Sequence, residues 1–135
     1  KVNADAFFKG LFETALRPHE MVTAVRIPAA DKSTRVGFAE LARRHGDYAM
    51  VGLAATARAQ AKGVADVRLA YFGVGSTPVR AKKAEAALAA GNIDAAVNAL
   101  DLEPPDDVQA TSKVKKHLAG VLLRRVAKQL LEARS

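Results

Sequence analysis

Cysteine and tryptophan are absent from the 135-residue sequence, and the aromatic residues are only five phenylalanines and two tyrosines. Without cysteine, the chain has no disulfide, thiolate zinc site, iron–sulfur ligand or cysteine nucleophile. The few aromatic residues argue against a groove that stacks nucleic-acid bases, so we expect no nucleic-acid partner. No stretch approaches the roughly 18 uncharged apolar residues of a membrane span, so we expect none.

Basic side chains are concentrated near the C-terminal end. The formal net charge is +7, and residues 111–135 contain seven of the 21 basic and one of the 14 acidic side chains. A nucleic-acid-binding domain usually carries a basic stripe across its fold, so this distribution weakens that function further. It predicts a basic helix that faces either solvent or an acidic partner.

The length corresponds to one ordinary domain. The sequence starts at Lys1 rather than at methionine and becomes apolar at once, at Val2, Phe7 and Phe8. We therefore expect a piece of a longer protein, and the alternative is a processed or incompletely determined end. Residues 5–10 are predicted to form a helical turn that stops at a glycine.

Alternation of apolar and polar residues predicts four strands, at residues 20–28, 35–43, 49–61 and 64–74. A proline closes the first of them. Short links join the last three, and parallel neighbours would need a longer crossover. We therefore expect these three to form an antiparallel meander.

After Gly75 the apolar period lengthens to about 3.6 residues, which indicates helices. Thr77 and Pro78 are predicted to be the cap and the first residue of a helix that ends near Ala90. A shorter helix over residues 93–100 and an acidic loop over 102–110 follow. The last helix is predicted to begin near Ser112, with an apolar face made of Val114, Leu118, Val121, Leu122, Val126 and Leu130.

Strands followed by helices indicate an α+β fold. We expect an antiparallel, three- to four-stranded meander sheet packed against about three C-terminal helices.

The sequence contains no evident catalytic or metal-binding cluster. His19, His45 and His117 do not have metal-ligand spacing with a carboxylate. No serine lies in a nucleophile elbow, and no acidic pair marks acid–base catalysis. Residues 73–78 follow a strand and open a helix, as phosphate loops do, but they lack the lysine and the third glycine of such loops. A helix start capped by Thr77 explains them without a ligand.

Residues 43–52 interrupt the strand pattern with charge, glycine and an aromatic ring. Turn formation accounts for Gly46 and Asp47 but not for the two preceding arginines or for Tyr48. An aromatic ring beside charges at a strand end could stack on a planar cofactor and hydrogen-bond with its edge. Two interpretations are open, a cofactor contact and a plain hairpin.

Four stretches in this order resemble the flavoprotein (medium) subunit of the molybdenum hydroxylases, the family of carbon monoxide and xanthine dehydrogenases. They are ADAFFKGLFETAL with RIP (residues 4–16 and 26–28), RRHGDYAMVG (43–52), GVGSTPVRA (73–81) and HLAGVLLRR (117–125). Together they extend over nearly the whole chain. The resemblance implies that residues 1–28 are the closing segment of the FAD-binding domain and residues 29–135 the C-terminal α+β domain. It also implies a further N-terminal half, with the glycine-rich loops that hold the FAD pyrophosphate.

By position, the resemblance implies that Tyr48 contacts the flavin ring, with Arg43, Gly46 and Asp47 in the loop beside it. Glu40 stands in the region where relatives have a lysine near the flavin, and this sequence has no lysine there. These five residues are the candidate cofactor-binding set, and no residue is assigned a catalytic role.

The implied cofactor is FAD, which the chain contacts only in part. The implied partners are a large subunit with the molybdenum cofactor and a small subunit with 2Fe-2S clusters. In such cytoplasmic enzymes, electrons pass from the molybdenum centre through the clusters to FAD and then to an external acceptor. We expect this oxidoreductase function of the assembly and no activity of the piece alone.

An alternative function is a non-catalytic α+β interaction module that uses the basic C-terminal helix. Its binding residues would be Lys113, Lys115, Lys116 and Arg124. The helix would then bind an acidic partner through these charges.

Overall fold

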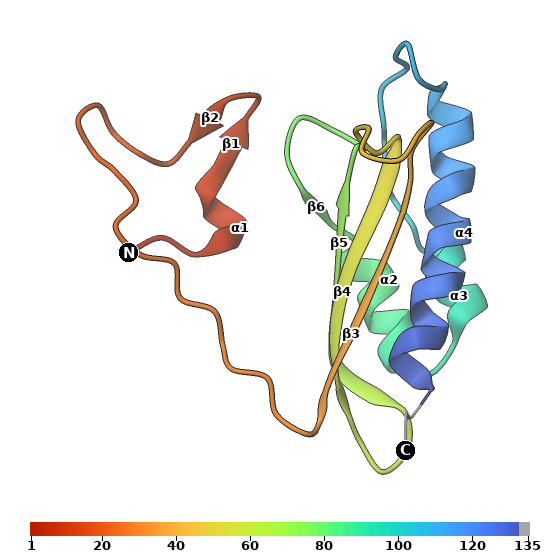
Figure 1. Cartoon of the computed structure of the whole chain (residues 1–135). Helices are drawn as coiled ribbons and strands as arrows, with labels where there is room; N and C mark the ends of the chain where they lie inside the picture. Colours follow the sequence, from red (N-terminus) through yellow and green to blue (C-terminus); the bar gives the residue numbers. More distant parts are fainter. Residues whose placement is uncertain (133–135) are drawn as a thin grey trace.

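Four antiparallel strands, joined as a meander in the order β3-β4-β5-β6, form the main sheet of the computed structural model, which describes residues 1–132 (Figure 1). The strands are β3 (Thr34–Leu41), β4 (Val51–Ala59), β5 (Val64–Phe72) and β6 (Val79–Arg80). The predicted meander is confirmed, and β6 is a short addition at its edge.

Three helices cover one face of this sheet (Figure 1). They are α2 (Lys82–Ala89), α3 (Ile93–Asn98) and α4 (Ser112–Leu131). The Asn92 side chain caps α3 by accepting a 2.8 Å hydrogen bond from the Ala95 amide, and Thr111 caps α4. The predicted α+β class, with a meander sheet and three C-terminal helices, is confirmed.

Alternate side chains of the strands face the helices, as the period of two requires. Tyr71 is fully buried there, and its hydroxyl donates a 3.0 Å hydrogen bond to the Ala119 carbonyl of α4. Removing the fully buried aliphatic side chains of this layer would cost about 2–5 kcal/mol each. The largest of them are Leu53, Leu69, Leu88, Leu122, Leu123, Leu130, Val51 and Val126.

The predicted start of α2 at Thr77 and Pro78 is wrong. Residues 79 and 80 pair with β5 instead, and the Ala81 amide donates to the Leu69 carbonyl, so the backbone stays extended up to that point. The helix begins at Lys82, and its N-cap, Ala81, has no side-chain cap.

Glu85 holds this turn of chain in place. Its carboxylate accepts hydrogen bonds from Arg80 at 2.6 and 2.7 Å and from the Leu69 amide at 2.8 Å. Burial raises the pKa of Glu85, but the bonds from Arg80 and Leu69 outweigh it, so the pKa lies below the ordinary value. Glu85 therefore stays ionised and joins α2 to both β5 and β6.

The buried face of α4 differs from the predicted apolar row. Val114 is 46% exposed, whereas Lys115 is buried at 2%. The buried face also includes small residues such as Ala119 and Gly120, which do not stand out in a pattern of large apolar side chains. The buried residues from the predicted row are Leu122, Val126 and Leu130.

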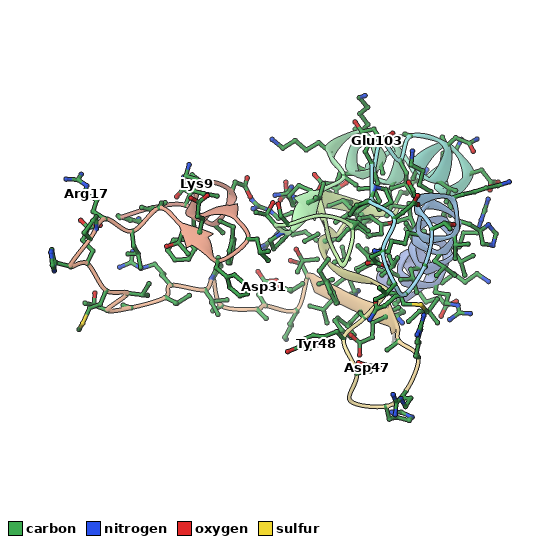
Figure 2. All side chains as sticks on the ribbon, turned by 90° about the horizontal axis from the view of Figure 1, so that it is seen from above. Lys9, Arg17, Asp31, Asp47, Tyr48 and Glu103 are labelled. Atoms are coloured by element: carbon green, nitrogen blue, oxygen red, sulfur yellow. The ribbon has the colours of Figure 1, made fainter. Side chains whose placement is uncertain are left out.

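The N-terminal segment, residues 1–30, extends away from the sheet (Figures 1 and 2). It contains α1 (Ala4–Phe7), β1 (Phe8–Gly10) and β2 (Glu13–Thr14), so the predicted turn at 5–10 is helical only in its first part. The predicted strand at 20–28 is wrong, because these residues pair with no other strand among residues 1–132. Strands need such a partner for their backbone groups.

The sheet face opposite the helices is uncovered, and we call it the open sheet face. Val36 and Phe38 are exposed on it at 68% and 55%. The rings of Phe38 and Phe72 stack there with centroids 6.0 Å apart, and Phe72 lies over Gly52. Contiguous exposed apolar surface of this kind commonly marks a place of contact with other protein or with a ligand.

Candidate functional site

The loop between β3 and β4, which we call loop 42–50, contains most of the candidate residues. It lies at the end of the sheet next to the start of α4 and the chain segment that leads into it (Figure 1). The Arg43 guanidinium Nη2 donates to the carbonyls of Val108 and Gln109 at 2.7 and 3.1 Å. Arg43 is therefore an internal attachment of the loop, and its donors at Nη2 are already engaged.

The outer part of loop 42–50 is exposed. The Asp47 amide donates to the Arg44 carbonyl at 3.2 Å, and the Asp47 carboxylate accepts from the Tyr48 amide at 2.9 Å. Gly46 has a φ of +80°, which favours glycine, and has open space around it. These bonds are within the turn, so they leave its outer surface free for a ligand or a neighbouring protein.

Tyr48 presents its ring to solvent, with 88% of the residue exposed. Figure 2 shows Tyr48 and Asp47 side by side on the loop, with the tyrosine ring pointing away from the helices. Tyrosine, which combines an apolar ring with a hydroxyl at its tip, is enriched at binding interfaces. The structure thus brings Gly46, Asp47 and Tyr48 together at the tip of the loop.

Glu40 belongs to β3 rather than to the loop. It pairs with Gly52 of β4, and its side chain is exposed. Within residues 1–132 its carboxylate makes no hydrogen bond or ion pair. Of the five candidates, Glu40 thus stands apart on the strand, Arg43 faces the protein, and the other three form the loop tip.

An ion pair between a buried lysine and a partly exposed aspartate, which the sequence did not indicate, lies beneath the loop. Lys115 Nζ donates to Asp107 Oδ2 at 2.5 Å and to the Gly73 carbonyl at 3.3 Å. The pKa of Asp107 is lowered to about 2 by the bond from Lys115 and then by the amides of Ala110 and Gln109. Lys115 was expected among the solvent-facing or partner-facing charges, and its position beneath the loop corrects that expectation.

The alternative binding surface is largely neutralised within the chain. Of its four cations, Lys115 pairs with Asp107, Lys116 with Glu103 at 2.8 Å, and Arg124 with Asp94. Exposed pairs like the last two contribute about 0–1 kcal/mol each, but they balance the charge that an acidic partner would need. The helix therefore offers much less free positive charge than the sequence suggested.

Residues 73–78 are structural in this fold, without a phosphate cradle of the usual kind. Gly73 has a φ of +75°, and a Cβ there would lie 2.8 Å from the carbonyl oxygens of Ala49 and Met50. The glycine is therefore required by the close approach of loop 42–50. Thr77, the predicted cap, caps no helix.

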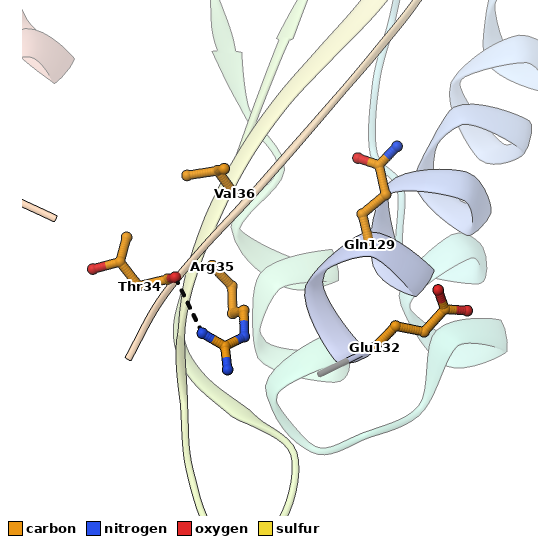
Figure 3. Close-up of a pocket in the computed structure, with 5 residues that line it drawn as sticks. All are labelled: Thr34, Arg35, Val36, Gln129 and Glu132. Atoms are coloured by element: carbon orange, nitrogen blue, oxygen red, sulfur yellow. Dashed lines mark hydrogen bonds between the residues drawn. The ribbon is translucent and has the colours of Figure 1, made fainter. Parts of the chain in front are cut away.

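A hollow of about 460 Å³ lies elsewhere, between β3 and the end of α4 (Figure 3). It is lined by Thr34, Arg35, Val36, Gln129 and Glu132, none of which is a candidate residue. Within residues 1–132, no group of three or more acidic or histidine side chains could hold a metal ion. In the same residues, no helix is both long and apolar enough to cross a membrane.

The sequence profile of the CO dehydrogenase flavoprotein C-terminal domain family matches residues 37–130. The chain belongs to this family. The match extends from β3 almost to the end of α4, so it includes loop 42–50 and the Asp107–Lys115 pair. The family corresponds to the C-terminal part of the FAD-binding medium subunit of the molybdenum hydroxylases, so the resemblance seen in the sequence is confirmed.

Curated members and relatives of the family extend beyond this chain. The chain is 29% identical to the glyceraldehyde dehydrogenase medium chain of Sulfolobus acidocaldarius, over 96% of this chain and 48% of that protein. It is 30% identical to the carbon monoxide dehydrogenase medium chain of Hydrogenophaga pseudoflava, over 92% of this chain and 46% of that protein. The chain spans about half the length of the curated relatives it matches.

Solved structures of the family have the same fold. Carbon monoxide dehydrogenase from Hydrogenophaga pseudoflava matches with a TM-score of 0.85 at 30% identity, over 93% of this chain and 46% of that one. Quinoline 2-oxidoreductase from Pseudomonas putida 86 matches with a TM-score of 0.78 at 29% identity, over 96% and 47%. At such coverage most of residues 1–28 must be included, so the extended N-terminal segment is shared with these relatives.

Proposed function

We propose that the chain is the C-terminal part of an FAD-containing electron-transfer subunit of a molybdenum hydroxylase. The proposal is supported by the family to which the chain belongs and by relatives named as medium chains of dehydrogenases. Its partners would be a large subunit with the molybdenum cofactor and a small subunit with 2Fe-2S clusters. FAD would take electrons from the clusters and pass them to an external acceptor, in a cytoplasmic enzyme.

Within this subunit, residues 1–28 would close an FAD-binding domain formed mostly by preceding sequence, and residues 29–135 would be the C-terminal domain. The large apolar side chains of the segment support this division, because they find no cover in the present fold. Phe12, Met21, Val25 and Ile27 are each more than 75% exposed. Burying four such side chains would contribute about 1.5–3 kcal/mol apiece, enough to hold the segment against a second domain.

Asp31 marks the boundary between the two parts. It accepts hydrogen bonds from Ser33, Thr34 and Arg58, the last at 2.5 Å. Bonds from Ser33 and then Arg58 hold the pKa of Asp31 well below its usual range, so the carboxylate is charged at all ordinary pH values. The chain is therefore fixed where it enters β3. The residues before it contact the sheet through the Asp5–Arg80 ion pair at 3.6 Å and leave their large apolar side chains exposed for contact with another domain.

The flavin contact is supported above all by the exposed ring of Tyr48 on a loop that is anchored beneath. A flavin ring is planar, with an apolar face and polar edges, and the residues at the loop tip fit one face of it. Tyr48 offers a ring for stacking, and Gly46 leaves open space beside it. The same residues offer no cradle for a pyrophosphate, which agrees with a flavin held mainly by other sequence.

At such a contact, the protein supplies position and electrostatics, while bound FAD supplies the electron-transfer chemistry. Tyr48 would cover one face of the ring and exclude water from it. Asp47 and Glu40 carry negative charge near the proposed flavin contact. Their charge would disfavour the negative charge that a flavin gains on reduction. The loop would thus influence how readily the flavin accepts electrons.

Replacement of Tyr48 in the flavin-loaded subunit that contains this chain tests the assignment. Tyr48→Ala removes the ring, and we expect a changed flavin absorption spectrum and a potential shift of about 20 mV, the equivalent of a stacking interaction of about 1 kcal/mol. Tyr48→Phe keeps the ring and should retain most of the native spectrum. His117→Ala, at an exposed position on α4, is the control. A native spectrum and potential in Tyr48→Ala would refute the contact.

A further inference from the structure

Loop 42–50 is attached to the rest of the domain near both of its ends. Near its start, Arg43 donates to the carbonyls of Val108 and Gln109. The conformation of that neighbouring turn is fixed by Asp107, whose Oδ1 accepts from the Gln109 and Ala110 amides at 2.9 and 3.0 Å. The direction of Arg43 therefore depends on Asp107, although the two side chains do not bond to each other.

The other end of the loop rests on the backbone after β5. The Met50 amide donates to the Leu41 carbonyl at 2.8 Å, which closes the loop. The carbonyls of Ala49 and Met50 approach Gly73 so closely that a Cβ there would lie 2.8 Å from each oxygen. The position of Gly73 thus limits where the end of the loop, immediately after Tyr48, can lie.

Lys115 joins the two attachments. Its Nζ donates to Asp107 Oδ2 at 2.5 Å and to the Gly73 carbonyl at 3.3 Å. Only 2% of its side chain is exposed, whereas the Asp107 side chain is 41% exposed. A buried ammonium group must keep its acceptors, because losing one leaves a desolvated charge unpaired. Lys115 therefore constrains the turn that holds Arg43 and the backbone that supports Ala49 and Met50.

We propose that Lys115, acting with Asp107, is a positioning residue that fixes both ends of loop 42–50 and thereby the direction in which Tyr48 projects. The part of this proposal that concerns the flavin rests on the proposed function. The charge of Lys115 serves the geometry of the loop, because its ammonium group is buried against Asp107 and the Gly73 carbonyl.

A purely structural pair would have a different effect from a positioning pair. If Lys115 only anchored the first turn of α4, its loss would lower the stability of the whole domain. Hydrogen exchange in the loop and in the neighbouring strands would then rise together. If it positions the loop, its loss frees the loop while the sheet and helices stay folded. Local hydrogen exchange separates these two results, since it measures opening residue by residue.

The first experiment measures amide hydrogen exchange of the chain without any cofactor. Lys115→Met keeps much of the side-chain volume and removes the charge. We expect the amides of Asp47, Tyr48 and Met50, which donate hydrogen bonds within or at the end of the loop, to exchange about tenfold faster or more, and those in the centre of β4 to remain at the native rate. Lys116→Met is the matched control, because the neighbouring lysine bonds to Glu103 and contacts neither attachment. Unchanged loop exchange in folded Lys115→Met, or equal acceleration in Lys116→Met, overturns the proposal.

A second variant covers the case in which Lys115→Met does not fold. Asp107→Asn keeps an oxygen for the Gln109 and Ala110 amides and removes the charge that faces Lys115. We expect a smaller acceleration in the same loop residues, and native exchange there would overturn the proposal.

The second experiment measures the flavin in the loaded subunit. We expect Lys115→Met to shift the flavin potential in the same direction as Tyr48→Ala, and the double variant to shift it no further than Tyr48→Ala alone. If Tyr48→Ala has no effect, the proposed flavin contact fails, while the exchange result still decides whether Lys115 positions the loop. If Tyr48→Ala shifts the potential and Lys115→Met does not, the link between Lys115 and the flavin fails.

Discussion

The ring of Phe72 lies directly over the backbone of Gly52. A Cβ on residue 52 would be 2.0 Å from Cζ of that ring, far inside van der Waals contact. On the same face, Phe72 stacks with Phe38, so one glycine near the start of β4 provides the room for an aromatic pair. Glycine in a strand interior often marks such a close approach.

We expect Gly52→Ala to destabilise the domain by about 1–3 kcal/mol, the usual cost of overpacking. The ring must move and lose its stack with Phe38. In a Phe72→Ala background the same substitution should cost less than about 1 kcal/mol, because the obstacle is gone. Urea unfolding of the four proteins of this cycle measures both values. Equal costs in the two backgrounds would show that Phe72 is not the obstacle.

Substitutions of Asn92 and Thr77 test where the helices begin, because Asn92 caps α3 in the structure whereas Thr77 was the cap expected for α2. Asn92→Ala removes the side-chain oxygen that caps α3 and should cost about 1 kcal/mol of unfolding free energy. Thr77→Ala should change it by less than about 0.5 kcal/mol, since Thr77 caps no helix. Thermal or urea unfolding checks the pair, and a larger loss for Thr77→Ala would contradict the observed start of α2.

The stability of the domain should depend on the charge of Asp107 in acid. Its pKa of about 2 in the folded chain lies below the ordinary aspartate value of 3.8. A lowered pKa stabilises the folded state above the ordinary value, and this contribution is lost as the pH falls from 3.8 towards 2. We expect the difference in unfolding free energy between the native chain and Asp107→Asn to be largest near neutral pH and to shrink as the pH falls from 3.8 towards 2. A difference that does not vary with pH would contradict the assignment.

The sheet was predictable because buried and exposed positions alternate along most of its three long strands, which are joined by short links. The strand expected at residues 20–28 has the same alternation, but a pattern cannot supply the neighbouring strand that its backbone needs. The start of α2 was misplaced for a related reason. Thr77 and Pro78 are typical of a helix start, yet pairing of residues 79 and 80 with β5 takes precedence over that local preference.

The candidate loop was recognisable because two arginines, a glycine, an acid and a tyrosine do not suit a simple strand meander. Its attachment was not predictable from the same residues. In the sequence, Arg43 and Lys115 look like ordinary solvent-facing charges. The partners of Arg43, Val108 and Gln109, are 65 and 66 residues away, and Gly73, a partner of Lys115, is 42 residues away. Contacts over such sequence separations depend on how α4 packs against the sheet. They become visible only in the folded chain.

The two tyrosines differ in a way that gives the protein an internal optical reporter. Because tryptophan is absent from residues 1–135, Tyr48 and Tyr71 account for most of the intrinsic fluorescence of this chain. Tyr71 is sealed between β5 and α4, out of reach of a dissolved quencher, whereas Tyr48 stands in solvent. In this chain, collisional quenching therefore reports on Tyr48, and a drop in quenching after a flavin is added would signal that the flavin has covered this ring, with no label attached.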